Sequence, residues 1–190
     1  YFNTLKFARK FQTLYPKNEN IAYIDFLIAM TFYEQVQIVA RDQTYTKAAL
    51  KEFKNIIEKY PNSKYAKESR LKIDLIDEQL AGKHMYLARF YMKKSKWISA
   101  IRRLNIILED YPETIYTIET LHRLVEIYYK LGNISLAKKY AATLGYNFND
   151  SDWYKKTYKV VVDQNYESDT KKTKIKLRDK IKNIFKLSKW

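Results

Sequence analysis

The stretch of sequence that decides the fold runs over residues 53–112, FKNIIEKYPNSKYAKESRLKIDLIDEQLAGKHMYLARFYMKKSKWISAIRRLNIILEDYP. The same pattern marks its two ends: an alanine is followed at +4 by a large apolar residue and at +12 by a proline. The two copies are Ala49, Phe53, Pro61 and Ala100, Leu104, Pro112. An aromatic residue precedes each proline, and residues 11–16 carry a third, partial copy. Self-similarity of this kind is typical of a repeat protein.

The composition favours a helical fold. A chain of 190 residues is long enough for one compact domain or one short solenoid with a buried core. It contains only three glycines and three prolines, and it lacks the Asn-Gly and Asp-Gly pairs of tight hairpins. Long helices joined by short turns are therefore expected. The chain has no cysteine, which excludes disulfides and cysteine metal sites, and no apolar run approaches the roughly 20 residues that span a bilayer.

The net charge of +15 has two interpretations. A strongly basic chain can bind nucleic acid, an anionic membrane surface or an acidic protein. Alternatively, Lys, Asn, Ile and Tyr are abundant together, as in the proteins of an A/T-rich genome. Nucleic-acid binding is not expected, because the 18 tyrosines fall at helical core spacing and do not form an exposed stacking row.

Apolar periodicity and turn signals predict eight helices. We expect them over residues 1–15, 21–39, 45–59, 64–94, 96–110, 113–131, 133–144 and from 152 onward. The proline turns, Asn62 or Ser63 as an N-cap and Gly132 as a C′ residue set the boundaries. Gly82 lies inside the longest segment, which we interpret as one helix, although a break into two helices is the alternative. Its expected buried stripe is Leu71, Leu75, Ile76, Leu80, Leu87, Phe90 and Tyr91.

Two segments fit the frame of a tetratricopeptide repeat, in which small residues let paired helices approach closely. The positions are Leu87, Ala88, Tyr91, Ala100, Leu104, Ile107, Pro112 and then Leu124, Val125, Tyr128, Ala137, Ala141, Leu144. The predicted fold is all-α: a tetratricopeptide-repeat superhelix, an α-α solenoid of antiparallel helix pairs. Residues 1–165 would form half of one repeat plus about three repeats.

Residues 166–190 are expected to form a basic amphipathic C-terminal helix or tail. Nine Lys or Arg residues lie between positions 171 and 189, and an apolar stripe accompanies them: Leu177, Ile181, Ile184 and Phe185. Such a segment can lie on an anionic membrane. It can equally dock on the last repeat as a cap, which is the interpretation we favour.

The repeat spacing is irregular, and the irregularity is informative. Successive prolines are 45 and 51 residues apart, whereas the standard repeat is about 34 residues long. The order of motifs resembles the BamD (ComL/YfiO) family of outer-membrane assembly lipoproteins from residue 7 to about residue 158. The matching segments are Phe11…Tyr15-Pro16 with Asn20-Ile21-Ala22-Tyr23, residues 60–66 (YPNSKYA), Leu80-Ala81-Gly82-Lys83, Ala88…Tyr91 with Trp97…Ala100…Arg103…Asp110-Tyr111-Pro112, and Asp152-Trp153-Tyr154.

The resemblance implies a function and a location. Similar proteins carry five tetratricopeptide repeats on the periplasmic face of a Gram-negative outer membrane, held by an N-terminal lipid. They are subunits of the β-barrel assembly machinery, the BAM complex, and bind its barrel subunit BamA and other assembly lipoproteins. By this comparison the first repeat, half of the second and the lipid anchor would lie upstream of Tyr1. The alternative is another tetratricopeptide-repeat adaptor for protein–protein interaction in the cell envelope.

The resemblance also suggests two binding surfaces. The C-terminal repeats of similar proteins dock on a periplasmic POTRA domain of BamA, which assigns Arg103, Arg102 and Trp97 to that contact; a merely solvated Arg103 is the alternative. Their N-terminal repeats receive C-terminal segments of unfolded outer-membrane proteins. The remaining wall of that client groove would be Asn20, Tyr23, Phe26 and Leu27, although burial in the solenoid core is the simpler role for Phe26 and Leu27.

No catalytic or metal-binding motif accompanies these surfaces. The two histidines, His84 and His122, are 38 positions apart, and no clustered metal motif, phosphate loop or nucleophile elbow occurs. Asp74, Asp77 and Glu78 share one helix with Lys72, which indicates a solvated charged face and not an acid/base pair. We therefore expect a binding protein that is not an enzyme and needs no cofactor.

Overall fold

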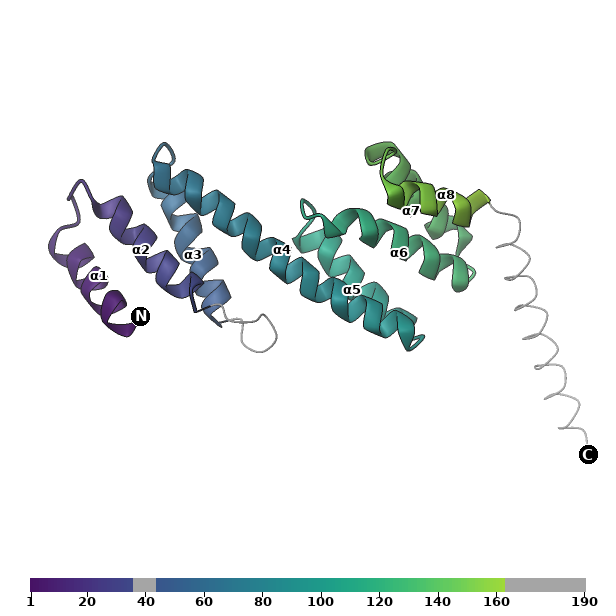
Figure 1. Cartoon of the computed structure of the whole chain (residues 1–190), viewed down its shortest axis with the longest axis horizontal. Helices are drawn as coiled ribbons and strands as arrows, with labels where there is room; N and C mark the ends of the chain where they lie inside the picture. Colours follow the sequence, from purple (N-terminus) through teal and green to yellow (C-terminus); the bar gives the residue numbers. More distant parts are fainter. Residues whose placement is uncertain (36–43, 163–190) are drawn as a thin grey trace, which may run out of the picture. The chain divides into compact units, whose positions relative to one another are not determined.

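The computed structural model describes residues 1–35 and 44–162, and over these ranges the chain is built of α-helices without strands (Figure 1). The helices are α1 (Phe2–Leu14), α2 (Ile21–Tyr33), α3 (Thr44–Lys59), α4 (Lys64–Lys93), α5 (Trp97–Asp110), α6 (Tyr116–Lys130), α7 (Ile134–Asn147) and α8 (Asp152–Val162). The all-α repeat architecture predicted from the sequence is confirmed. The expected C-terminal segment 166–190 lies outside the described residues.

The chain divides into two compact units, residues 1–86 and residues 87–190, and the division falls inside α4. In the first unit, α2 packs against both α1 and α3. Phe53 of α3 is fully buried, and the rings of Phe26 and Tyr33 from α2 lie against it at centroid distances of 6.0 and 6.1 Å. Small and aliphatic residues complete this core: Ala8, Ile28, Ala29, Ala49, Ile56, Ala66 and Ile76.

A buried carboxylate ties three segments of the first unit together. Asp25 of α2 accepts hydrogen bonds from the amide of Gln12 on α1 and from the hydroxyl of Tyr60, just after α3, at 3.1 Å. Burial, and then the charge of Asp25, raise the pKa of the Tyr60 phenol. The tyrosine of the Tyr-Pro motif is therefore a structural donor that fixes the end of α3 against α2.

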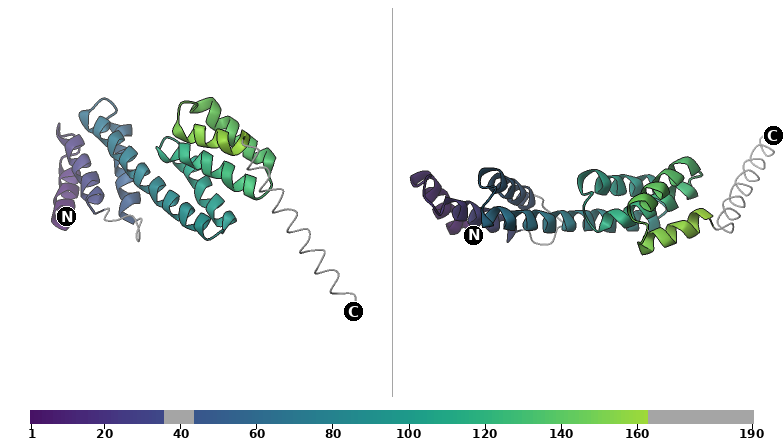
Figure 2. Two further views of the ribbon diagram at one scale, coloured as in Figure 1. Left: turned by 45° about the vertical axis from the view of Figure 1, so that its right-hand side comes forward. Right: turned by 90° about the horizontal axis from the view of Figure 1, so that it is seen from above.

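In the second unit, α6 packs against α5, α7 and α8, and both views in Figure 2 keep α6, α7 and α8 together. Most small and aliphatic positions of the tetratricopeptide frame are fully buried: Ala88, Ala100, Leu104, Ile107, Leu124, Val125, Ala137 and Leu144. Leu87 and Ala141 are half-buried. Gly145 permits close approach of α8, since a Cβ there would lie 2.9 Å from Cε2 of Tyr154. The repeat frame read from the sequence thus corresponds to the packed interface between helices.

Two turns of the second unit share one geometry. After α4, the amide of Lys96 donates to the carbonyl of Tyr91, and after α6 the amide of Asn133 donates to the carbonyl of Tyr128, both at 2.9 Å. Together with neighbouring backbone bonds that span fewer residues, these two bonds form the Schellman arrangement, which satisfies carbonyls at a helix end. The arrangement needs a positive φ, which Gly132 adopts at 79° as predicted, whereas Ser95 adopts it at 55° despite its side chain.

The N-cap predicted at residues 62–63 is observed, and a second serine caps α8. The side chain of Ser63 accepts a hydrogen bond from the amide of Ala66 at 3.1 Å, and Ser151 accepts one from the amide of Tyr154 at the same distance. Gly82 lies inside α4, which runs as a single helix as expected. Helix α8 begins at Asp152, also as expected.

Four expectations were wrong in detail. Helix α7 runs to Asn147, three residues beyond its expected end at residue 144. Helix α2 ends at Tyr33, because the side-chain amide of Gln35 donates to the carbonyl of Thr31 while its backbone amide donates to the carbonyl of Phe32, which tightens the chain into a turn. Residues 36–39 of the predicted helix lie outside the described residues. Helix α6 begins three residues late, since Thr117 bonds back to the carbonyl of Pro112. Leu71, Leu75 and Phe90 are exposed, because Ala66, Ala81, Met85 and Ala88 supply the buried face of α4 with Ile76 and Leu80.

Candidate functional site

The proposed client-groove residues occupy the first half of α2 and the turn before it. Asn20 is the exposed N-cap residue of α2, without a side-chain capping bond. Tyr23 is exposed, and its ring lies 5.7 Å from that of Tyr65 on α4. Phe26 is half-buried between Tyr65, at 5.5 Å, and the core residue Phe53.

These four residues do not play equivalent parts. Leu27 is half-buried like Phe26, so both contribute to packing, whereas Tyr23 and Asn20 face solvent. Tyr65 joins Tyr23 and Phe26 into one aromatic cluster, with the ammonium of Lys64 5.0 Å from its ring. The sequence reading omitted Tyr65, although it stands in the YPNSKYA segment. We name Tyr23, Phe26 and Tyr65 the aromatic surface.

A shallow hollow adjoins this helix. It has a volume of about 290 Å³ and is lined by Leu14, Tyr15, Pro16, Lys17 and Asn18 in the turn between α1 and α2. The amide of Asn20 donates to the side chain of Asn18 at 2.9 Å, which fixes the turn directly before α2. Leu14 and Tyr15 are exposed, so an apolar wall and a lysine lie close to the proposed client-facing residues.

The proposed partner-facing residues surround α5 and do not share one face. Successive helical residues turn by about 100°, which sets Trp97 and Arg103 about 120° apart, on opposite sides of the buried stripe. Arg102 is exposed on the outer side, and Arg103 is half-buried. Trp97 is half-buried, with the ammonium of Lys130 5.1 Å from its ring. A single flat partner could contact Arg102 together with Arg103, which are about 100° apart, but not Trp97 as well, which lies about 140° from Arg102.

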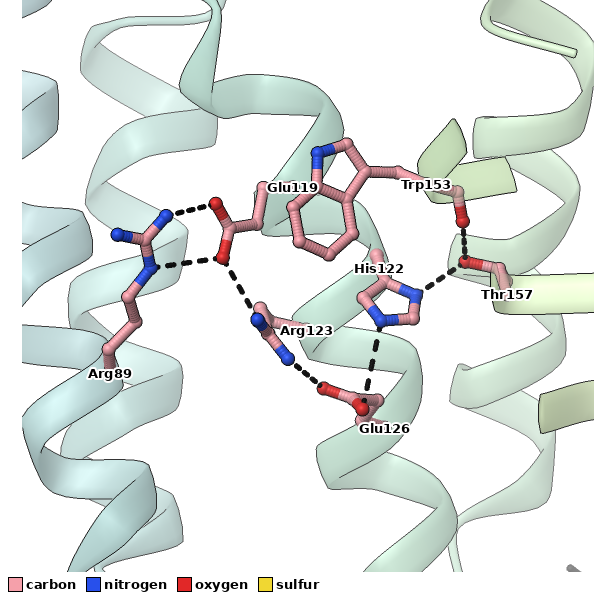
Figure 3. A network of polar contacts seen from close by, with 7 residues as sticks. All are labelled: Arg89, Glu119, His122, Arg123, Glu126, Trp153 and Thr157. Atoms are coloured by element: carbon pink, nitrogen blue, oxygen red, sulfur yellow. Dashed lines mark hydrogen bonds and ion pairs between the residues drawn. The ribbon is translucent and has the colours of Figure 1, made fainter. Parts of the chain in front are cut away.

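The most elaborate polar arrangement among the described residues links α4, α6 and α8 (Figure 3). Glu119 of α6 is buried and accepts hydrogen bonds from both Arg89 of α4, whose Nε lies at 3.0 Å, and Arg123 of α6, whose Nε lies at 3.1 Å. Arg123 also donates from Nη1 to Glu126 at 2.8 Å. Only the α6 pairs have a sequence signal, the i,i+4 and i,i+3 spacing of opposite charges.

His122 forms the α8 side of this network. Its Nδ1 lies 2.7 Å from the hydroxyl of Thr157, and that hydroxyl donates to the carbonyl of Trp153 at 2.8 Å. Since the threonine has only one proton to give, the imidazole Nδ1–H is the donor to Thr157. Nε2 then faces a carboxylate oxygen of Glu126 at 3.7 Å. The buried ring is also 5.1 Å from that of Trp153.

The electrostatics keep the network in one charge state. Burial opposes the charged form of Glu119, but hydrogen bonds from Arg89 and then Arg123 outweigh it, so the pKa of Glu119 is lowered. Burial is also the main cause that lowers the pKa of His122, assisted by Arg123 and Lys156 and opposed by Glu126 and Glu119. His122 is therefore held neutral and Glu119 charged at pH 7, which suits a structural tie between helices.

No reactive centre emerges from this geometry. Across residues 1–35 and 44–162, His, Asp and Glu side chains nowhere gather in threes as a metal site requires. Within the same residues, every helix is too short or too polar to cross a membrane.

Known proteins with similar sequences agree with this architecture. Residues 1–144 match the YfiO family, described as an outer membrane lipoprotein. A protein of Rickettsia prowazekii (strain Madrid E), named outer membrane protein assembly factor BamD, is 40% identical over 168 residues, 88% of this chain and 66% of that protein. Proteins of the same name from Caulobacter vibrioides (strain ATCC 19089 / CIP 103742 / CB 15) and Xylella fastidiosa (strain 9a5c) are 40% and 28% identical, each over 156 residues.

These alignments cover a larger share of this chain than of its relatives. The Caulobacter alignment covers 82% of this chain and 51% of its relative, and the Xylella alignment covers 77% and 53%. The chain thus spans between about half and two thirds of the length of the relatives it matches. The family match covers most of the helical repeats described above. The chain belongs to the YfiO family of outer membrane lipoproteins.

Proposed function

We propose that this chain is part of a non-catalytic scaffold subunit that assists the folding and insertion of outer-membrane β-barrel proteins. The family match over residues 1–144, with relatives named outer membrane protein assembly factor BamD, carries the proposal. Paired helices with exposed aromatic and basic side chains support a binding role. The protein would act at the periplasmic face of the outer membrane as a lipid-anchored subunit.

The second unit would provide the docking surface for the periplasmic POTRA domain of BamA. Arg103 is the chief candidate, because a half-buried guanidinium can pair with a carboxylate in two-point geometry. Arg102 would contact the same partner from the exposed side of α5. Trp97 lies on the other flank of the buried stripe, so in this proposal it contributes to α5 packing more than to the contact.

The first unit would contact C-terminal segments of unfolded outer-membrane proteins. The aromatic surface supports this assignment, because a partly exposed cluster of rings can hold an apolar segment at low conformational cost. Asn20 and the hollow at residues 14–18 would extend it with backbone and amide groups. Phe26 would be a half-buried ring of the aromatic surface, and Leu27, also half-buried, would support it by packing.

Capture of the chain by the immobilised periplasmic domains of BamA tests the partner assignment. We expect Arg103→Glu to weaken this binding about tenfold or more, because reversing a charge at a contact replaces attraction by repulsion. Arg70→Glu, at an exposed arginine of the first unit, is the matched control and should bind like the unsubstituted chain. If the unsubstituted chain fails to bind at micromolar concentration, the chain is better described as a different repeat adaptor of the cell envelope.

Cross-linking to synthetic peptides tests the client surface. The peptides would carry the last strand of outer-membrane β-barrel proteins, and we expect Tyr23→Ser to reduce their cross-linking severalfold. Tyr146→Ser removes a more exposed tyrosine from the second unit and should leave the yield unchanged. Equal losses in both variants would show that the peptides respond to general apolar exposure and not to the aromatic surface.

A further inference from the structure

The charged side chains of the second unit are separated between its two ends. Helix α6 packs against both α5 and α7, and consecutive helices run antiparallel, so turns 94–96 and 131–133 share one end while turns 111–115 and 148–151 share the other. The sequence contains no Asp or Glu from 79 to 108 or from 127 to 149. The acids flank the opposite turns: Glu109, Asp110, Glu113, Asp150 and Asp152.

Direct contacts confirm which segments meet at the acid-free end. The ammonium of Lys130, at the end of α6, lies 5.1 Å from the ring of Trp97, at the start of α5. Val160 and Val161, near the end of α8, pack against a core cluster that includes Tyr129 and Ala137, on either side of turn 131–133. The chain therefore leaves α8 at this same end. We name residues 93–98 and 130–134 the basic edge.

The basic edge combines cations with exposed apolar groups. Lys93, Lys94, Lys96 and Lys130 are all exposed. Between them stand Ile98, Leu131 and Ile134, whose relative exposures are 64%, 45% and 37%. Trp97 adds a half-buried indole. Lysines around exposed aliphatic side chains and a tryptophan are the composition of a segment that lies in a bilayer interface, where ammonium groups reach phosphates and the apolar groups enter the acyl boundary.

We propose that the basic edge binds the surface of a membrane rich in anionic phospholipid. Charge complementarity favours phosphate headgroups, because four ammonium groups project here, and Glu126, the acid one turn before Lys130, is already paired with Arg123. The exposed aliphatic groups favour a bilayer over nucleic acid or a highly acidic peptide, since the acyl boundary removes them from water and a polyanionic chain offers little apolar surface to do so. Beyond α8 the sequence supplies nine further Lys or Arg residues between 171 and 189, with Asp179 as the single acid. This binding does not depend on the protein partners proposed above.

Co-sedimentation of the full chain with lipid vesicles tests the proposal. The vesicles contain phosphatidylglycerol and phosphatidylcholine in equal amounts, with pure phosphatidylcholine vesicles for comparison. Replacing the four edge lysines by glutamine should weaken binding to the anionic vesicles about tenfold or more, because each lysine near such a surface contributes about fivefold. The matched control carries four glutamines at exposed lysines of the first unit, Lys10, Lys47, Lys51 and Lys67, and should change affinity less than about threefold.

A second variant separates membrane insertion from simple charge attraction. Ile98→Ser with Leu131→Ser keeps the net charge and removes two exposed aliphatic groups, and we expect it to lower vesicle affinity severalfold. With Trp153 and Trp190 replaced by phenylalanine, Trp97 becomes the sole tryptophan, and brominated lipid should quench its fluorescence.

Two outcomes would overturn the proposal. Equal affinities of the edge and control lysine variants would assign any binding to net charge or to residues beyond 162. Loss of binding to a polyglutamate peptide, with vesicle binding unchanged, would identify an acidic protein partner instead. Circular dichroism of each variant before the assay ensures that folded proteins are compared.

Discussion

Replacing Glu119 by glutamine should destabilise the second unit by about 2–3 kcal/mol. Glu119 accepts charged hydrogen bonds from two arginines, and bonds of this kind contribute about 1.5–3 kcal/mol each. Removing one member of a buried ion pair costs about 3–5 kcal/mol when the remaining charge stays dry. The Arg89 side chain is 49% exposed and that of Arg123 is 26% exposed, so water can solvate both guanidiniums. Because water reaches both guanidiniums, we expect the loss of stability to lie at or just below the lower end of the range of about 3–5 kcal/mol for a broken buried ion pair.

Urea unfolding followed by tryptophan fluorescence measures this loss in the relevant unit. All three tryptophans, at positions 97, 153 and 190, belong to residues 87–190, so their emission reports on the second unit. Trp153 is the most informative, because its ring contacts His122 and has the Arg123 guanidinium 5.2 Å away. A shift of the midpoint at constant slope would give the free-energy change directly.

The control and the refuting result are well defined. Glu113→Gln makes the same change of charge at an exposed position in the turn before α6, and should alter stability by less than about 0.5 kcal/mol. If Glu119→Gln lowered the free energy of unfolding no more than Glu113→Gln, the hydrogen bonds to Glu119 drawn in Figure 3 would add no stability beyond what water provides, and the prediction would be refuted. A double-mutant cycle with Arg89→Ala would then show no coupling between α4 and α6.

Three further outcomes follow from single features. Ser95→Gly should raise the stability of the second unit by about 0.5–1 kcal/mol in the same urea assay, because glycine adopts the positive φ at that turn without strain; a loss of stability would contradict this. Phe53→Ala should destabilise the first unit by about 3–5 kcal/mol by circular dichroism, since the ring is fully buried; Tyr45→Ala, at an exposed ring of α3, is its control. Burial lowers the pKa of His122 below 6.5, so the unfolded chain takes up a proton first, and stability should fall as the pH drops below 6.5. His122→Gln should flatten that dependence, and an unchanged slope would assign it to other groups.

The sequence predicted the helices more accurately than the surfaces between them. The proline turns, Gly132 and Ser63 act on the helix ends next to them, so short sequence patterns were enough to predict the limits of most helices. The buried face of α4 did not, because Ala81 and Ala88 displace larger residues such as Leu71 from the interior. Apolar size predicts burial only where helices do not need to approach closely.

The polar network could be predicted only in part. The spacing of Glu119, Arg123 and Glu126 along α6 was visible in the sequence as opposite charges three and four residues apart. The partners from other helices, Arg89 and Thr157, are 30 and 35 positions away from the residues they contact. No local pattern connects them, and a lone histidine gives no sign that a threonine hydroxyl will hold it.

The continuity of α4 has a practical consequence for dissecting this protein. The boundary between residues 86 and 87 falls in the interior of a 30-residue helix, where no linker exists to cut. A protease acting on the folded chain would meet helical backbone there, and cleavage would leave four amides and four carbonyls without partners on the two new ends. Separately expressed halves should therefore overlap, each retaining several turns of α4 beyond the boundary, so that neither core is left beside a frayed end.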